Sequence, residues 1–279
     1  MSKIIMLGTG NGGTLDLYNT CFVIQNEKGV FLVDTGGSVE IVRRLKEVDI
    51  SLTDIKNIFI SHSHTDHILG LIWMFKRMSR MAKRGEIKEK INIYCNDVVY
   101  EAIKGVSNLI LPTVLMDAIY KITNFVVLND CDKYTINGIN YEFFDILAKG
   151  TKQFGFECRL NENRLIFLGD ETLNPLLNDR VRGADYVMHE AFCLDREENI
   201  FHAYEKNHST ALSAAKTMNE LETRNLILYH TEESHGKDRK RLYQEEAQSV
   251  FQGNVIVPDD LEEIEIAKVL EKRNWKWKK

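Results

Sequence analysis

The chain has 279 residues, of which 44% are hydrophobic and only three are prolines. This composition excludes long disordered tracts and is sufficient for a full core in one large or two small domains. The formal net charge of -5 provides no overall attraction to nucleic acid, so a polyanionic substrate would need a local basic patch.

The first predicted elements are antiparallel strands. Short β-rich runs lie at 3–10, 20–25 and 29–37, and a hairpin turn is predicted at Asn26 to Gly29. The glycine-rich GTGNGG at 8–13 matches G-x-G-x-x-G, but another strand rather than a helix follows it. We therefore expect a loop that lets the backbone pass close to a site, and no dinucleotide fingerprint.

Helix and strand patterns then alternate. Apolar spacing predicts a helix over 38–48, and an apolar strand over 55–64 runs into a histidine cluster. A helix with a basic second half is predicted over 67–90, followed by a strand at 91–95 and helical stretches to about residue 122.

The second half has the same order of elements. Strands are predicted at 124–128, 139–144, 154–160, 164–170, 185–190, 225–230, 254–258 and 262–267, and helices at 209–221 and about 238–251. No linker separates the halves. We predict one domain, residues 1–279, with sheets inside and helices outside.

The cysteines and the hydropathy indicate the compartment. Five cysteines, odd in number and without C-x-x-C spacing, predict neither a disulfide framework nor a thiolate zinc site. They are Cys21, Cys95, Cys131, Cys158 and Cys193. No stretch has the features of a signal peptide or the roughly 20 apolar residues of a membrane span. We expect a soluble cytoplasmic protein with no membrane partner.

The stretch SHSHTDHILG at 61–70 contains the strongest chemical signal. His62 and His64 follow a strand end and can share a face, while Asp66 and His67 can point to a second position nearby. Imidazole and carboxylate without thiolate suit zinc, manganese or iron. Two such ions, about 3.5–4 Å apart, recur in enzymes that hydrolyse phosphoesters.

The spacing H-x-H-x-D-H followed by Gly70 resembles the signature of the metallo-β-lactamase superfamily. That resemblance implies an α/β fold, a four-layer αββα sandwich with metals at one edge of the sheets. VDTGG at 33–37, LGD at 168–170 and LYH at 228–230 agree in order. MHEAF at 188–192 and NHSTALSAA at 207–215 are similar to two loops of the ribonuclease Z group.

The resemblance implies the following site. One metal takes His62 and His64, the other takes Asp66, His67 and His230, and Asp170 bridges them. Asp66 would orient the attacking hydroxide, and Glu190 with His208 would form a relay near the leaving oxygen. The residues alone favour a different role for His208, that of a helix-entry residue beside the N-cap candidates Ser209 and Thr210.

One ligand of that group is missing. Its members place another histidine shortly before a Gly-aromatic pair, here Gly155-Phe156, yet 145–154 contains none. Asp145, a water or a changed loop would fill the gap, and Lys149 would do so only after losing a proton. We expect one or two divalent ions, with the His62 and His64 site weaker or more exchangeable.

The predicted activity is that of a metal-dependent phosphodiesterase resembling ribonuclease Z, with a metal-bound hydroxide as nucleophile. Only 13 residues separate Phe156 from Asp170, where ribonuclease Z inserts a long arm for tRNA. A small or flexible phosphodiester is therefore expected, such as a cyclic nucleotide or short RNA. Hydrolysis of a carbonyl ester, thioester or lactam, and a non-catalytic binding protein, are the alternatives.

Two basic segments offer contacts to nucleic acid. Residues 76–90 form either a solvated helix face or a phosphate-contacting one. The tail at 272–279 interleaves Trp275 and Trp277 with lysines, which suits either stacking on single strands or packing on the protein body. The resemblance also implies a homodimer.

Overall fold

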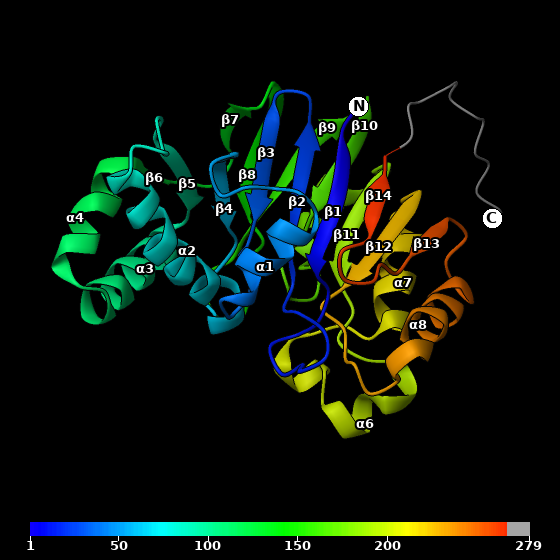
Figure 1. Ribbon diagram of the computed structural model, residues 1–279. Helices are drawn as coiled ribbons and strands as arrows, with labels where there is room; N and C mark the ends of the chain where they lie inside the picture. The colour runs from blue at the N-terminus through cyan, green and yellow to red at the C-terminus, as the bar shows by residue number, and fades with distance from the viewer. Residues whose placement is uncertain (267–279) are drawn as a thin grey trace.

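The computed structural model describes residues 1–266, and these form four layers (Figure 1). Two seven-stranded sheets face each other across an apolar core, and helices cover the outer face of each sheet. The predicted αββα sandwich is confirmed.

The first sheet begins antiparallel and ends parallel. Its strand order is β14-β1-β2-β3-β4-β5-β6, with antiparallel pairing from β14 to β3 and parallel pairing from β3 to β6. The predicted hairpin turn joins β2 to β3. The strands are β1 (Lys3–Gly8), β2 (Cys21–Asn26), β3 (Gly29–Val33), β4 (Ile55–Ile60), β5 (Ile91–Cys95), β6 (Thr123–Val127) and β14 (Glu263–Glu265).

The second sheet has the order β13-β12-β11-β10-β9-β8-β7, antiparallel from β7 to β10 and parallel from β10 to β13. Strand β7 was not predicted, because it is a polar edge strand that pairs only with β8. The strands are β7 (Asp132–Ile136), β8 (Ile139–Asp145), β9 (Phe154–Leu160), β10 (Asn163–Phe167), β11 (Tyr186–Glu190), β12 (Asn225–Tyr229) and β13 (Asn254–Ile256).

The helices cover the two outer faces. On the first sheet lie α1 (Glu40–Glu47), α2 (Thr65–Lys83), α3 (Asp97–Ile110) and α4 (Thr113–Ile122). The second half contains α5 (Asn178–Val181), α6 (Glu198–Phe201), α7 (Ala211–Glu220) and α8 (Arg239–Gln248). The sequence did not predict α5 and α6, since four residues are too few to show a helical period. Among the described helices, none combines the length and apolar character that crossing a membrane requires.

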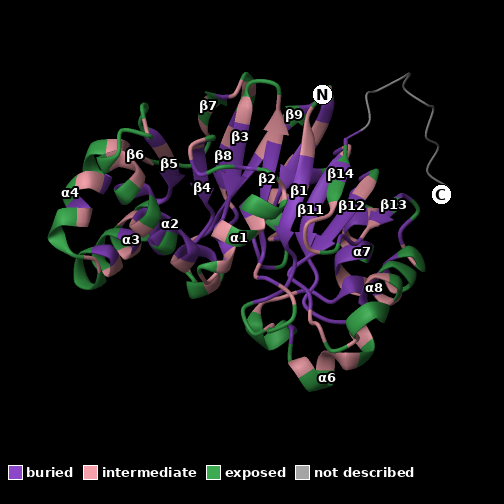
Figure 2. Cartoon of the chain, in the orientation of Figure 1, coloured by how far each residue is buried: buried purple, intermediate pink, exposed green. Residues whose placement is uncertain are grey.

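Successive side chains of each strand point to opposite faces of the sheet, and this alternation separates the core between the sheets from the outer helical layers. In β1, Ile4 and Met6 face the core between the sheets, whereas Ile5 and Leu7 face the helices of the first outer layer. Phe31 of the first sheet meets Tyr141 of the second with ring centroids 4.8 Å apart. Figure 2 shows the buried residues concentrated in the strands between the helical layers.

Candidate metal centre

The predicted metal ligands lie where parallel strands end. His62 follows β4, Asp170 follows β10, and His230 comes directly after β12. These strands belong to the parallel parts of the two sheets. Because carboxyl ends of parallel strands share one edge of a sheet, the fold brings residues separated by more than a hundred positions to one place.

Helix α2 supplies two more of these side chains. His64 is its N-cap residue, with extended backbone, so Asp66 and His67 lie in the first helical turn. The Thr35 hydroxyl donates to the His67 carbonyl at 2.7 Å, and the amide of Gly70 donates to the Gly36 carbonyl at 2.8 Å. These bonds hold the start of α2 against the loop after β3.

Four donors form the first cluster. Atoms of Asp66, His67, Asp170 and His230 lie within 4.8 Å of one another. Nε2 of His67 is 3.4 Å from Oδ2 of Asp66 and 3.4 Å from Oδ2 of Asp170. Nε2 of His230 is 3.7 Å from the same Asp170 oxygen. Four nitrogen and oxygen donors match the coordination number that zinc prefers.

Three donors form the second cluster, which shares Asp170. Nε2 of His62 is 3.1 Å from Oδ2 of Asp170, and His64 completes the group. His62 is fully buried, whereas His64 is exposed. The second cluster therefore has fewer donors than the first, and one of its donors, His64, is more accessible to solvent.

Unpartnered buried atoms show that these residues fit a cation. Nε2 of His62, Nε2 of His67 and Oδ1 of Asp170 are buried without a hydrogen-bond partner. Leaving a polar atom in that state costs about 1–3 kcal/mol. Divalent ions at the two donor clusters would satisfy all three atoms, and the donor set without thiolate suits zinc, manganese or iron.

The electrostatics of the cluster follow from its burial. Burial alone would raise the pKa of the Asp170 carboxyl, but the facing His62 imidazole and its neighbours hold it well below its usual value. Burial lowers the pKa of His230 to about 3, so that its imidazole is neutral and able to ligate. Burial and the neighbouring His62 also lower the pKa of His64.

Neighbouring side chains hold the predicted ligands in place. Oδ2 of Asp34 lies 2.9 Å from Nδ1 of His67 and accepts a hydrogen bond from the Ser61 hydroxyl at 2.7 Å. Oγ1 of Thr20 lies 3.3 Å from Nδ1 of His230. Asp34 belongs to the VDTGG segment that the sequence singled out, whereas nothing in the sequence pointed to Thr20.

The gap left by the missing histidine is not closed by the residues considered for it. Asp145 belongs to neither donor cluster, and its Oδ1 accepts the amide of Leu147 at 2.8 Å. Lys149 is exposed, and its amide donates to Glu171 at 2.8 Å. Gln153, which the sequence did not suggest, is fully buried, and its Oε1 accepts the amide of Asp170 at 3.2 Å.

Glu190 and His208 meet beside the clusters. Glu190 ends β11 and is fully buried, and its Oε2 lies 3.6 Å from Nδ1 of His208. Burial lowers the pKa of His208, but the Glu190 and Asp170 carboxylates outweigh it and raise that pKa. The rings of His208 and His230 are 5.3 Å apart. The two loops thus bring an acid–histidine pair next to a predicted ligand.

The glycine-rich loop lies against the site, as expected. A Cβ on Gly12 would lie 3.0 Å from Oδ2 of Asp66, and a Cβ on Gly37 would lie 3.3 Å from the Asp66 Cα. Two backbone segments can approach Asp66 closely because both positions lack a side chain.

The basic segments have different outcomes. Of residues 76–90, those up to Lys83 continue α2, and Arg84 pairs with Glu86 in the exposed turn that follows. These contacts do not test whether residues 76–90 bind nucleic acid, so that contact stays a prediction. Trp275 and Trp277 lie outside the described residues.

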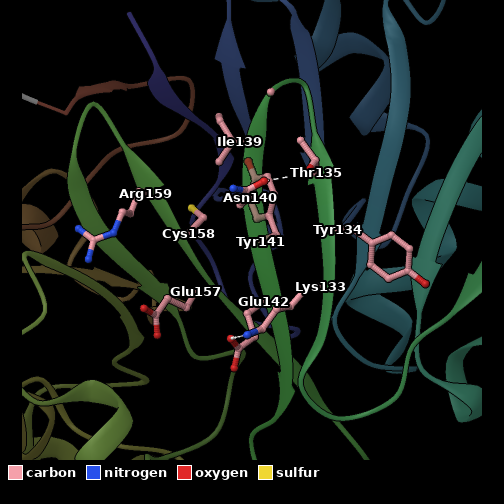
Figure 3. A pocket seen from close by; sticks show the side chains of 11 residues that line it. Lys133, Tyr134, Thr135, Ile139, Asn140, Tyr141, Glu142, Glu157, Cys158 and Arg159 are labelled. Atoms are coloured by element: carbon pink, nitrogen blue, oxygen red, sulfur yellow. Dashed lines mark hydrogen bonds and ion pairs between the residues drawn. The ribbon is translucent and has the colours of Figure 1, made fainter.

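A separate hollow lies beside β7, β8 and β9, on the part of the sheet that includes the β7–β8 turn (Figure 3). Its charged side chains pair with one another or with neighbours: Lys133 lies 3.1 Å from Glu142, and Arg164 lies 2.7 Å from Glu157. The hollow contains none of the predicted ligands.

Comparisons with known proteins agree with this geometry. Residues 2–255 match the profile of the family described as "Anti-Pycsar protein Apyc1". Ribonuclease Z of Archaeoglobus fulgidus is 25% identical, with 95% of this chain and 97% of the relative aligned.

Solved structures share the fold. The metallo-β-lactamase fold protein YhfI of Bacillus subtilis is 18% identical with a TM-score of 0.76, covering 94% of this chain and 98% of its own. The short form of human tRNase Z is 20% identical with a TM-score of 0.70, covering 96% of this chain and 100% of its own.

Proposed function

The chain belongs to the family of the anti-Pycsar protein Apyc1 and is a metal-dependent phosphodiesterase resembling ribonuclease Z; we propose that it cleaves small or flexible phosphodiesters, namely cyclic nucleotides or short RNA. One observation supports this substrate class. Strand β9 passes into β10 through a tight turn at Asn161 and Glu162, both with positive φ. The resemblance to ribonuclease Z would place a tRNA-binding arm at this point in the sequence.

The proposed ligand assignment uses both donor clusters. His62 and His64 would hold one ion, Asp66, His67 and His230 would hold the other, and Asp170 belongs to both donor clusters. Bound divalent cations, by preference zinc, lower the pKa of water toward ~7 and neutralise charge on the phosphoryl oxygens. The buried unpartnered atoms of His62, His67 and Asp170 support this assignment.

The chain's own acid–base groups would move the protons. Asp66 accepts a hydrogen bond from the attacking water and orients it toward phosphorus. Glu190 favours the protonated form of His208, in agreement with the raised pKa of that imidazole. As the bond between phosphorus and the leaving oxygen breaks, His208 gives its proton to that oxygen.

A substrate panel tests the proposal. Protein reconstituted with zinc or manganese is assayed on bis(p-nitrophenyl) phosphate, cyclic nucleotides, a tRNA precursor, a thioester and a lactam. Turnover of the phosphodiesters, with cyclic nucleotides ahead of the tRNA precursor, is expected. Turnover confined to the thioester or lactam would contradict it, and no turnover with any metal would indicate a binding protein.

Three further features are proposed with this function. Residues 1–279 form one domain, two copies form a homodimer, and the protein works in the cytoplasm, where its five free cysteines stay reduced. Light scattering on the purified protein decides between monomer and dimer, and fractionation of expressing cells tests the compartment.

A further inference from the structure

The imidazole of His208 lacks a hydrogen bond to its partner carboxylate. Nδ1 of His208 is 3.6 Å from Oε2 of Glu190, and both atoms are buried without a hydrogen-bond partner. The other oxygen of Glu190 accepts the amide of Ser209. Glu190 therefore supplies charge, but at this distance it does not fix the rotation of the ring.

An aromatic ring lies directly against the imidazole. The rings of Phe192 and His208 are stacked, with centroids 4.7 Å apart and an interplanar angle of 12°. Nζ of Lys206 lies 4.9 Å from the centroid of the same Phe192 ring. Phe192 is 8% exposed, so its ring contacts protein rather than solvent.

The backbone of Phe192 is fixed on both sides. Its amide donates to the Ser209 carbonyl at 2.8 Å, which ties it to the segment that carries His208. Its carbonyl accepts the Glu232 amide at 2.8 Å and the Tyr243 hydroxyl at 3.0 Å. These bonds leave the Phe192 backbone little freedom. The phenyl ring therefore provides a fixed surface on which the His208 imidazole stacks.

We propose that Phe192 is a positioning residue that holds the His208 ring in the orientation needed to protonate the leaving oxygen. The inference rests on the proposed function of His208. Phe192 acts through His208, against which its ring is stacked, whereas its contact with the predicted ligand His230 is tilted, with ring centroids 6.4 Å apart. Parallel stacking restricts an imidazole to one plane, which the Glu190 contact does not do.

A purely structural role is the alternative, since Phe192 also packs in a small cluster with Cys193, Ala203 and Phe201. Phe201→Leu is the matched control, because it removes a phenyl ring from this cluster without a ring contact to His208. Phe192→Leu removes the stacking, and Phe192→Tyr retains it.

The first measurement is independent of turnover. In NMR spectra of the metal-loaded protein, ring current from Phe192 should shift the His208 ring protons upfield. Phe192→Leu should abolish that shift, and Phe192→Tyr and Phe201→Leu should preserve it. Unchanged His208 signals in folded Phe192→Leu would overturn the inference, even if the protein turned over no phosphodiester.

The second measurement uses leaving groups of different basicity. Bis(p-nitrophenyl) phosphate releases a stable phenolate that needs no proton, whereas a cyclic nucleotide releases an alkoxide that does. Phe192→Leu should lower kcat on the cyclic nucleotide at least about tenfold with KM little changed, and barely alter the nitrophenyl substrate. An equal loss on both substrates would assign Phe192 to stability instead.

Failure of the proposed function has a different signature. In that case wild-type protein would cleave neither phosphodiester, while the NMR comparison would still decide whether Phe192 stacks on the His208 ring.

Discussion

Oδ2 of Asp34 lies 2.9 Å from Nδ1 of His67, and both residues are buried. The same oxygen accepts the hydroxyl of Ser61, and Oδ1 accepts the Ser61 amide at 2.8 Å. Asp34 has a positive φ of 55°, which ends β3 and turns its carboxylate toward α2. Asp34 thereby fixes the His67 ring with Nε2 toward Asp66 and Asp170.

We expect Asp34→Asn to weaken metal binding without unfolding the protein. Loss of an outer-shell carboxylate typically lowers metal affinity by about 10–100-fold. Chelator competition measures the affinity, and circular dichroism checks the fold. Asp54→Asn is the control, since Asp54 is an exposed carboxylate that accepts the Ser51 amide in a turn. Equal affinity in Asp34→Asn and wild type would show that Asp34 does not orient His67.

The two donor clusters should bind metal unequally. The Asp66, His67, Asp170 and His230 cluster has four donors, whereas the His62, His64 and Asp170 cluster has three. We expect one ion to survive dialysis and a second to bind more weakly by at least about tenfold, in a calorimetric titration with zinc.

His64→Ala tests which cluster is the weaker one. It should abolish the second binding event and leave the first, because His64 belongs only to the three-donor cluster. His202→Ala, which removes an exposed histidine 3.6 Å from Glu205, should alter neither event. Loss of the tighter ion in His64→Ala would reverse the assignment.

His208→Ala should reduce turnover while metal content stays constant. A general acid contributes typically about 10²–10⁴-fold to the rate, so kcat on a cyclic nucleotide should fall within that range. Metal analysis per chain provides the second readout.

Asp66→Ala, by contrast, should lose metal as well as activity, because Asp66 belongs to the four-donor cluster. Near-wild-type turnover in either variant would refute its proposed role.

Gly70→Ala should destabilise the protein although Gly70 lies inside helix α2. Alanine normally stabilises a helix interior by about 1 kcal/mol relative to glycine. A Cβ on Gly70, however, would lie 1.9 Å from the Thr35 carbonyl oxygen. We expect a loss of about 1–3 kcal/mol in the free energy of unfolding, as for overpacking.

Gly105→Ala is the matched control for Gly70→Ala. Gly105 lies in α3, and a Cβ there would have no atom within 4 Å. Chemical denaturation should show this variant equal to or more stable than wild type. If both variants changed stability in the same direction, the close approach of α2 to the loop after β3 would not explain the effect of Gly70→Ala.

The sequence predicted elements best where one side-chain period was sustained. The strands at 91–95 and 154–160 have the predicted bounds, because their apolar runs are flanked by polar residues. Edge strand β7 and the four-residue helices α5 and α6 escaped prediction. Short or polar segments of this kind form through tertiary pairing rather than through their own periodicity.

By itself the sequence determined the donor types and the fold class. H-x-H-x-D-H at a strand end specifies imidazole and carboxylate donors at fixed local spacing. The sandwich was implied by the resemblance of this motif, and of the landmarks that follow it, to the metallo-β-lactamase superfamily. Local spacing cannot decide what meets across the two sheets. Only the tertiary structure decided that Asp145 belongs to neither donor cluster, that Thr20 lies beside His230, and that Phe192 stacks on His208. These relationships join residues far apart in the chain, so they depend on which strand ends and loops the packed sheets bring to one edge.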